Sequence, residues 1–314
     1  MKRVANRLMT LGVNMIQFMG AHYSNADGRK AFSGSIAGFF NPLLPFYHQF
    51  NSYVASVSYL SASTIPQSKV LLFIPLRQQR QTSTVLPGYS NDLSLQRLYE
   101  DSINALLHEG IGYDLISDDL AGNISVKDGA LEAFGYKYDC IVFPGMEYIS
   151  EDTAKLIEQM KQSNAKMIFV DKIPAFIAEK GEKFDANFNM QTVDENIMQD
   201  ANAYRIVTSK LPVDMKVYGA SLKKIIGKSI LGVESDLRVY ITERENAAAK
   251  VYFISNDDNR EGKIYIDSMP GMKIFSADTK QEIATKVENG RVQFLQKIEG
   301  ICTSSTNFNI FLIN

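Results

Sequence analysis

The pattern that most constrains the fold of this chain is an alternation of short apolar runs and amphipathic helical segments between residues 69 and 171. KVLLFIP (69–75) and YDCIVFPG (138–145) have the β-branched and aromatic content of buried strands. LSLQRLYEDSINALLHEG (93–110) repeats leucine at helical spacing and stops at a glycine. Strands that are joined through helices by short connections form a parallel sheet covered on both faces. We therefore predict a doubly wound α/β domain.

Further strands and a helix start extend this prediction. YDLIS (113–117) and KMIFVD (166–171) have the composition of buried strands, and Ser150 is placed to cap the helix that precedes the second of them. A short hairpin-like insertion separates the second and third strands. The pattern is less regular towards the end of the domain, where we predict a helix near 194–208. The prediction for residues 66–230 is a flavodoxin-like domain.

The period of the apolar residues changes to two from residue 237 onward. LRVYITERE (237–245), AKVYFISN (249–256) and NFNIFLIN (307–314) alternate apolar and polar residues and are separated by turn-forming residues. This pattern is typical of antiparallel strands, and we predict a portion of a β-sandwich over residues 231–314.

The first 65 residues are predicted to form one strand, one loop and one helix. GVNMIQFMGAHYS (12–24) has the apolar run of a buried strand that continues into a loop, and Pro45 suits the first turn of the helix that follows. Strand, loop and helix make the repeating unit of a (β/α) barrel, so residues 1–65 are predicted to be a remnant of one. The same pattern also fits the first unit of an open sheet.

Composition and charge exclude several functional classes. Lys and Arg number 33 against 35 Asp and Glu, so the chain lacks the basic excess that binds nucleic acid or an anionic membrane. Two cysteines and three histidines offer no zinc-binding spacing, and we predict no metal site. The basic, apolar start resembles a signal peptide, but polar residues interrupt it, so we recognise none. No run approaches the ~20 apolar residues of a membrane span.

Five segments carry a resemblance to a known family. They are NPLLPFYHQFNSYVASVSYLSAS (41–63), GYDLISDDL (112–120), GYKYDCIVFPGMEYISEDTAKLIEQM (135–160), VYFISNDDNREGKIYI (251–266) and KIFSADTKQEI (273–283). In their order and amino-acid sequence these segments resemble the large multidomain glycoside hydrolases, most closely the α-L-rhamnosidase-like family with an amidotransferase-like accessory domain. Several sugar-cleaving families share this back half, so the resemblance indicates the class of enzyme more specifically than the sugar.

The resemblance implies a fold, an activity and a location. The parallel-sheet domain would be of the class I amidotransferase-like type, and the catalytic carboxylates would lie in a barrel upstream. The substrate would be a carbohydrate with a terminal deoxy sugar. The parent enzyme would work in the periplasm or outside the cell, and a homo-oligomer is a further expectation.

The scarcity of acidic residues in residues 1–65 indicates that such a catalytic site is incomplete here. Glycoside hydrolysis generally uses two carboxyl groups roughly 5–10 Å apart across the scissile bond. Before residue 66 the only acidic residue is Asp27. We therefore expect the chain to be the C-terminal portion of a glycoside hydrolase and to be inactive alone.

Candidate substrate-binding residues follow the predicted first strand. In a barrel His22 and Tyr23 would face the active site, where a histidine hydrogen-bonds sugar hydroxyls and a tyrosine ring packs on a sugar face. The alternative is an ordinary loop histidine and a packing tyrosine. No catalytic residue is assigned.

Other candidate residues favour structural roles. Asp118 and Asp119 follow a strand at the edge where open α/β sheets bind ligands, but such a pair more often caps a helix or a turn. Cys140 lies within a predicted strand, as a buried inert thiol does. The loop after KVLLFIP lacks a glycine-rich phosphate-binding pattern, so no cofactor is predicted. His108 ends a helix, where a cation is favoured.

Two alternative functions remain open at this point. The chain is a non-catalytic carbohydrate-binding or oligomerisation module in the first of them. In the second it is a flavodoxin-like protein that binds a cofactor through the Ser and Thr residues after its first parallel strand.

Overall fold

The structure is a computed structural model, and the chain divides into two compact units. The α/β unit comprises Gln67–Val233, and the β unit combines Met1–Pro66 with Glu234–Asn314. The structure describes residues 2–17, 41–82, 93–185, 187–193, 201–208, 214–227, 232–258, 261–277, 279–296 and 308–313.

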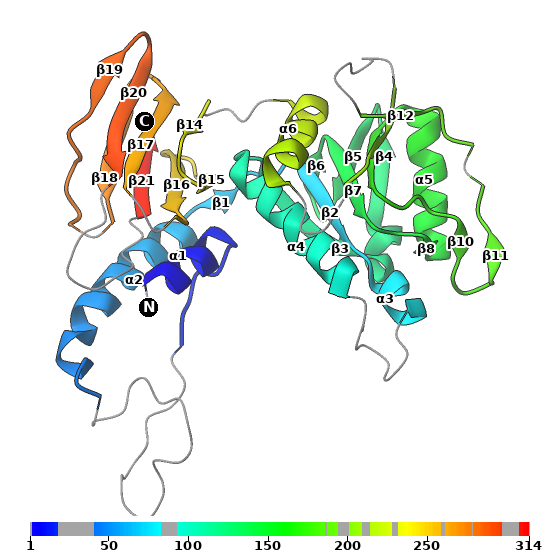
Figure 1. Cartoon of the computed structure of the whole chain (residues 1–314), viewed down its shortest axis with the longest axis horizontal. Helices are drawn as coiled ribbons and strands as arrows, with labels where there is room; N and C mark the ends of the chain where they lie inside the picture. Colours follow the sequence, from blue (N-terminus) through cyan, green and yellow to red (C-terminus); the bar gives the residue numbers. More distant parts are fainter. Residues whose placement is uncertain are drawn as a thin grey trace, which may run out of the picture. The chain divides into compact units, whose positions relative to one another are not determined.

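The α/β unit is built on a six-stranded parallel sheet in the order β12-β13-β9-β7-β2-β3 (Figure 1). Three central strands are almost wholly buried, because helices cover both faces of the sheet. The strands are β2 (Val70–Ile74), β3 (Tyr113–Ser117), β7 (Cys140–Pro144), β9 (Lys166–Val170), β12 (Met190–Thr192) and β13 (Ala203–Ile206). The mixed α/β character with a parallel sheet is as predicted.

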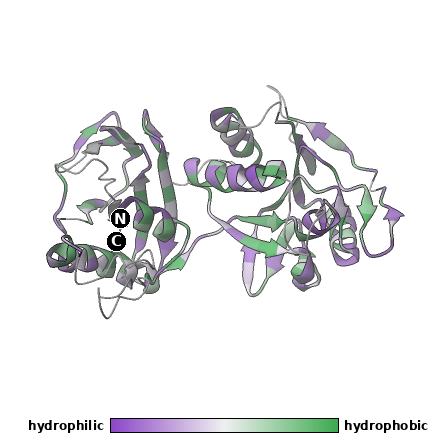
Figure 2. Cartoon of the chain, turned by 60° about the horizontal axis from the view of Figure 1, so that its bottom comes forward, coloured by the Kyte–Doolittle hydropathy of each residue, from purple (hydrophilic) through white to green (hydrophobic). Residues whose placement is uncertain are grey.

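Alternate residues of these strands supply two separate cores. On one face Phe73, Phe143 and Phe169 lie in a row, with ring centroids 4.9 and 5.2 Å apart, and helix α5 (Glu151–Ser163) packs on the same cluster. On the other face helices α4 (Leu93–His108) and α6 (Met215–Ile226) cover a second cluster. Figure 2 shows hydrophobic and hydrophilic residues alternating along the helices, as expected for helices with one buried face.

Small elements complete the unit. A three-stranded antiparallel sheet of β4 (Ile124–Lys127), β5 (Ala130–Ala133) and β6 (Tyr136–Tyr138) corresponds to the predicted hairpin-like insertion. The remaining elements are α3 (Leu76–Thr82), η3 (Asp118–Asn123), β8 (Tyr148–Ile149), β10 (Phe176–Ile177) and β11 (Glu182–Lys183).

The predicted helix near 194–208 is wrong over its described part. Ala203–Ile206 forms strand β13, which pairs in parallel with β9, and Tyr204 and Ile206 are buried. The local sequence is polar and has no clear period, so its conformation is determined by pairing with the edge of β9. Residues 194–200 lie outside the described residues.

The β unit contains two antiparallel sheets, in the orders β1-β15-β16-β21-β18 and β14-β17-β20-β19. Antiparallel sheets were predicted from the period of two. Their strands are β1 (Ile65–Pro66), β14 (Glu234–Ser235), β15 (Val239–Glu245), β16 (Lys250–Asn256), β17 (Gly262–Asp267), β18 (Lys273–Ser276), β19 (Lys286–Glu288), β20 (Arg291–Gln296) and β21 (Phe308–Ile313).

Two N-terminal helices pack on the first of these sheets. Helix α1 (Lys2–Thr10) contributes Met9, and helix α2 (Tyr47–Ala62) contributes Tyr53 and Val57, to a core completed by Val251 and Phe253. The turn η2 (Leu44–Phe46) leads into α2, so the helix predicted from Pro45 is present. The buried strand predicted over 12–24 is wrong for residues 12–17, which lie outside any strand, and the remainder lies outside the described residues. The barrel origin of residues 1–65 stays a prediction.

Buried polar contacts fix both helices to the sheet. The Arg244 guanidinium on β15 donates to Thr64 Oγ1 (3.0 Å) and to the carbonyls of Ser61 (2.6 Å) and Thr64 (2.8 Å) at the end of α2. The Ser61 carbonyl lies in the last turn of α2, at the negative end of the helix dipole, and Thr64 lies two residues beyond the helix. The Asp257 carboxylate in turn binds Arg3 of α1 (3.5 Å) and Arg238 (3.0 Å). Each helix is thus held by an arginine contact as well as by apolar packing.

We expect Arg244→Ala to destabilise the β unit by about 2–4 kcal/mol, because buried carbonyls lose a charged donor. Arg244→Lys should destabilise the β unit by a smaller amount, since an ammonium cannot reproduce the forked hydrogen bonding of the guanidinium. Calorimetric unfolding measures the change in stability of both variants, and hydrogen exchange of β15 and β16 shows whether the change lies in the β unit. The exposed Arg291→Ala is the control and should change little. Equal effects of the two alanine variants would contradict the role of Arg244.

Candidate functional site

The carboxyl edge of the parallel sheet is where open α/β sheets usually bind ligands. Asp118 follows β3 at this edge and is 1% exposed. Its carboxylate accepts hydrogen bonds from the amides of Arg77 (3.2 Å) and Ser150 (3.3 Å) and from Thr153 Oγ1 (3.1 Å). Burial raises the pKa of Asp118, and these donors oppose the rise. Asp118 therefore ties together the starts of α3 and α5.

The neighbouring polar residues are also engaged in structural contacts. Asp119 pairs with the Arg77 guanidinium at 3.0 Å, and Glu179 reaches the same guanidinium at 3.1 Å. The buried Gln78 accepts hydrogen bonds through Oε1 from the amides of Glu147 (2.9 Å) and Tyr148 (3.0 Å). This edge resembles a helix-capping network more than a ligand site, as the sequence indicated for the aspartate pair.

A small hollow lies beside this network. It measures about 100 Å³ and is lined by Gln78, Ser94, Leu95, Leu98, Gly145, Asp171 and Lys172. Small-molecule pockets usually occupy roughly 300–1000 Å³. The hollow formed by these residues is therefore too small for a flavin or a nucleotide.

Cys140 is the first residue of β7 and is completely buried. Burial, with a smaller contribution from the Asp139 charge, raises the pKa of the thiol to about 12. A reactive cysteine needs exposure and a lowered pKa. Cys140 is therefore part of the core, where it packs with Val142 and Leu72.

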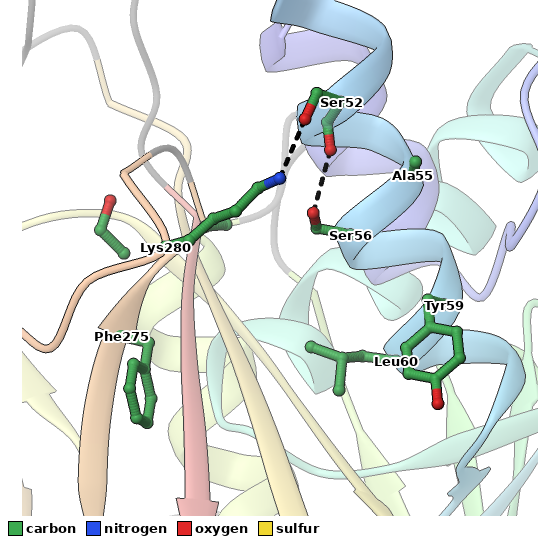
Figure 3. A pocket seen from close by; sticks show the side chains of 9 residues that line it. Ser52, Ala55, Ser56, Tyr59, Leu60, Phe275 and Lys280 are labelled. Carbon is green, nitrogen blue, oxygen red and sulfur yellow. Dashed lines mark hydrogen bonds between the residues drawn. The ribbon is translucent and has the colours of Figure 1, made fainter.

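A larger pocket lies in the β unit, between α2 and the strand β18 (Figure 3). It measures about 540 Å³, which is within the usual range for ligand sites. Its lining combines aromatic, aliphatic and hydroxyl side chains with a single lysine. The lining residues are Ser52, Ala55, Ser56, Tyr59, Leu60, Phe275, Ser276, Ala277 and Lys280. Sequence analysis missed this pocket, because its walls are more than 200 positions apart in the chain.

The predicted substrate-binding residues His22 and Tyr23 lie outside the described residues, so their role stays a prediction. Over the part of the chain that the structure describes, no three His, Cys, Asp or Glu side chains gather in a way that would hold a metal ion. Within the same residues no helix is long and apolar enough to cross a membrane.

Comparison with known proteins finds its matches among solved structures. No family model and no curated protein matches the chain. A beta-galactosidase from Bacillus circulans sp. alkalophilus has a TM-score of 0.62 at 11% identity, over 99% of this chain and 51% of that protein. A rhamnosidase from Novosphingobium sp. PP1Y has a TM-score of 0.60 at 12% identity, over 99% of this chain and 29% of that protein.

A third solved structure agrees with these two. It is a catalytic mutant of Gan42B, a GH42 beta-galactosidase from G. stearothermophilus, with a TM-score of 0.59 at 10% identity, over 95% of this chain and 48% of that protein. The chain therefore has a fold found in glycoside hydrolases, and it spans only 29–51% of the length of these three proteins.

We expect Asp118→Ala to destabilise the α/β unit by about 2–4 kcal/mol, because three donors, two of them buried, lose their acceptor. Since the pKa of Asp118 in the folded state lies above that of an ordinary aspartate, the stabilisation by Asp118 is complete below the ordinary pKa and declines as the pH rises through the folded-state pKa. Urea unfolding should therefore show a difference between wild type and variant that shrinks with rising pH. Asp119→Ala is the control, with an effect of about 0–1 kcal/mol. A difference that grows with pH would contradict this assignment.

Reaction with a thiol reagent tests the state of Cys140. In a Cys302→Ser variant, Cys140 is the remaining cysteine. We expect no reaction with 5,5′-dithiobis(2-nitrobenzoate) in buffer at mildly alkaline pH, because the thiol is buried and protonated. Full reaction is expected in denaturant. Rapid labelling of the folded variant would show that the thiol is accessible.

Proposed function

We propose that this chain is the C-terminal portion of an α-L-rhamnosidase-like glycoside hydrolase that removes a terminal deoxy sugar. The single observation that carries the proposal is the match to a rhamnosidase over 99% of this chain but only 29% of that protein. Two beta-galactosidases with similar scores support the wider class of sugar-cleaving enzymes. The segments quoted from the sequence favour the rhamnosidase among them.

The chemistry of glycoside hydrolysis supports a catalytic site outside this chain. A hydrolase needs one carboxyl group to protonate the leaving oxygen and a second to activate water or attack the sugar. Asp27 is the only acidic residue before residue 66, and Asp118 is occupied by three hydrogen bonds. We propose that the catalytic pair lies outside this chain and that the chain alone is inactive.

The α/β unit is proposed to be a flavodoxin-like, amidotransferase-like accessory domain. Without the short edge strand β12, its strands follow the spatial order 2-1-3-4-5, which is the flavodoxin-like order. The buried Cys140 lies within a strand rather than on an exposed turn, so an amidotransferase-like nucleophile has no counterpart at that position. The domain would act as a scaffold.

The location and partners of the enzyme are part of the same proposal. The substrate would be a carbohydrate, met in the periplasm or outside the cell, and the enzyme would form a homo-oligomer. A second candidate is a non-catalytic carbohydrate-binding module. The pocket beside α2, with the 73% exposed Tyr59 in its wall, favours this candidate as a function of the chain by itself.

Hydrolysis of aryl glycosides tests the leading proposal. We expect the chain alone to release no nitrophenol from nitrophenyl α-L-rhamnoside or β-D-galactoside, because it lacks the carboxyl pair. The polypeptide extended upstream by the preceding genomic codons should cleave the rhamnoside. Hydrolysis by the chain alone, an inactive extended polypeptide or a genome without an open frame upstream would each contradict the proposal.

A further inference from the structure

The pocket beside α2 is an elongated trough with one regular wall. Ser52, Ala55, Ser56, Tyr59 and Leu60 recur at helical spacing and form a single stripe on the helix. The small residues of this stripe leave room between the helix and β18. Figure 3 shows Lys280 pointing across the trough towards Ser52, whereas Tyr59 and Leu60 lie further along the helix.

One end of the trough is cationic. Among the described residues that line the trough, Lys280 is the only charged one, and helix α2 contains no Asp, Glu, Lys or Arg. Its Nζ lies 2.9 Å from Ser52 Oγ, and no carboxylate of the described residues forms an ion pair with it. The turn after β18 fixes its backbone, because the Lys280 amide donates to the Ser276 carbonyl at 2.8 Å. The ammonium and the hydroxyl together suit an anionic oxygen.

The other end is aromatic and apolar. Tyr59 is 73% exposed, Leu60 next to it on the helix is half-buried, and Phe275 is half-buried in the opposite wall formed by β18. Seven residues separate Ser52 from Tyr59, which is about two helical turns or roughly 10 Å along the axis. A ligand that fills the trough therefore needs an anionic group at one end and a flat apolar face at the other.

We propose that this trough binds an acidic oligosaccharide, such as one that contains uronate residues. The carboxylate of one sugar accepts hydrogen bonds from Lys280 Nζ and Ser52 Oγ, and the apolar face of the next sugar packs on the Tyr59 ring. The choice of a carbohydrate rests on the proposed function, whereas the choice of an anion rests on Lys280. The site is made by the β unit and requires no residue of the α/β unit.

Calorimetric titration of the full chain with digalacturonate and with its methyl ester tests the proposal. We expect the neutral ester to bind about tenfold more weakly, and Lys280→Met to weaken the binding of the acid by a similar factor. Tyr59→Ala should weaken the binding of both ligands. The matched control is Lys273→Met at the start of β18, the strand that precedes the turn of Lys280; Lys273 is exposed and absent from the lining. Salt should weaken the binding of the acid more than that of the ester.

Several results would overturn this inference. They are equal binding of the acid and the ester, unchanged binding by Lys280→Met, and an absence of binding. Self-association that Ala55→Arg abolishes, without binding of digalacturonate, would assign the trough to a second copy of the chain instead. If the extended polypeptide hydrolyses the rhamnoside but does not bind digalacturonate, the proposed site is contradicted and the proposed function is supported. Binding without hydrolysis would keep the site and remove the proposed function.

Discussion

The contact between the Arg244 guanidinium and the end of α2 is the constraint on which the β unit depends. A buried cation is costly unless its donors are satisfied, and here a carbonyl of the last turn of α2 and two oxygens of Thr64 just after the helix accept from it. Burial lowers the pKa of Arg244, but an arginine remains charged at any physiological pH. The interaction fixes α2 against β15. Because α2 forms one wall of the trough, the shape of the proposed binding site follows from this contact.

Buried polar groups in the α/β unit have a comparable structural role. Asp118 and Gln78 lie at the edge of the sheet where a ligand is usually found, and both accept hydrogen bonds from backbone amides of neighbouring elements. The hydroxyls of Ser102 and Tyr218 lie 2.7 Å apart and join α4 to α6 in the same way. A sheet edge occupied by such contacts suits a scaffold, which agrees with the proposed accessory role of this unit.

Local sequence was informative wherever a segment is buried by its immediate neighbours. KVLLFIP, YDLIS, YDCIVFPG and KMIFVD each contain a strand of the parallel sheet, and Ser150 accepts a hydrogen bond from the Thr153 amide (3.0 Å), as its capping position predicted. The sequence was misleading for Ala203–Ile206, where pairing with β9 outweighs a weak local pattern. It also gave no sign of α1, a short helix whose contacts are with residues far along the chain.

By itself the sequence determined the class of the fold, because the periods of its apolar residues distinguish buried parallel strands from antiparallel ones. It also determined that Cys140 would be a core residue and that the first 65 residues offer one carboxylate. Only the tertiary structure decided that residues 1–66 belong with 234–314 and that Lys280 lies beside Ser52. The reason is physical: periodicity records which side of an element is buried, whereas the surface that covers it comes from distant parts of the chain.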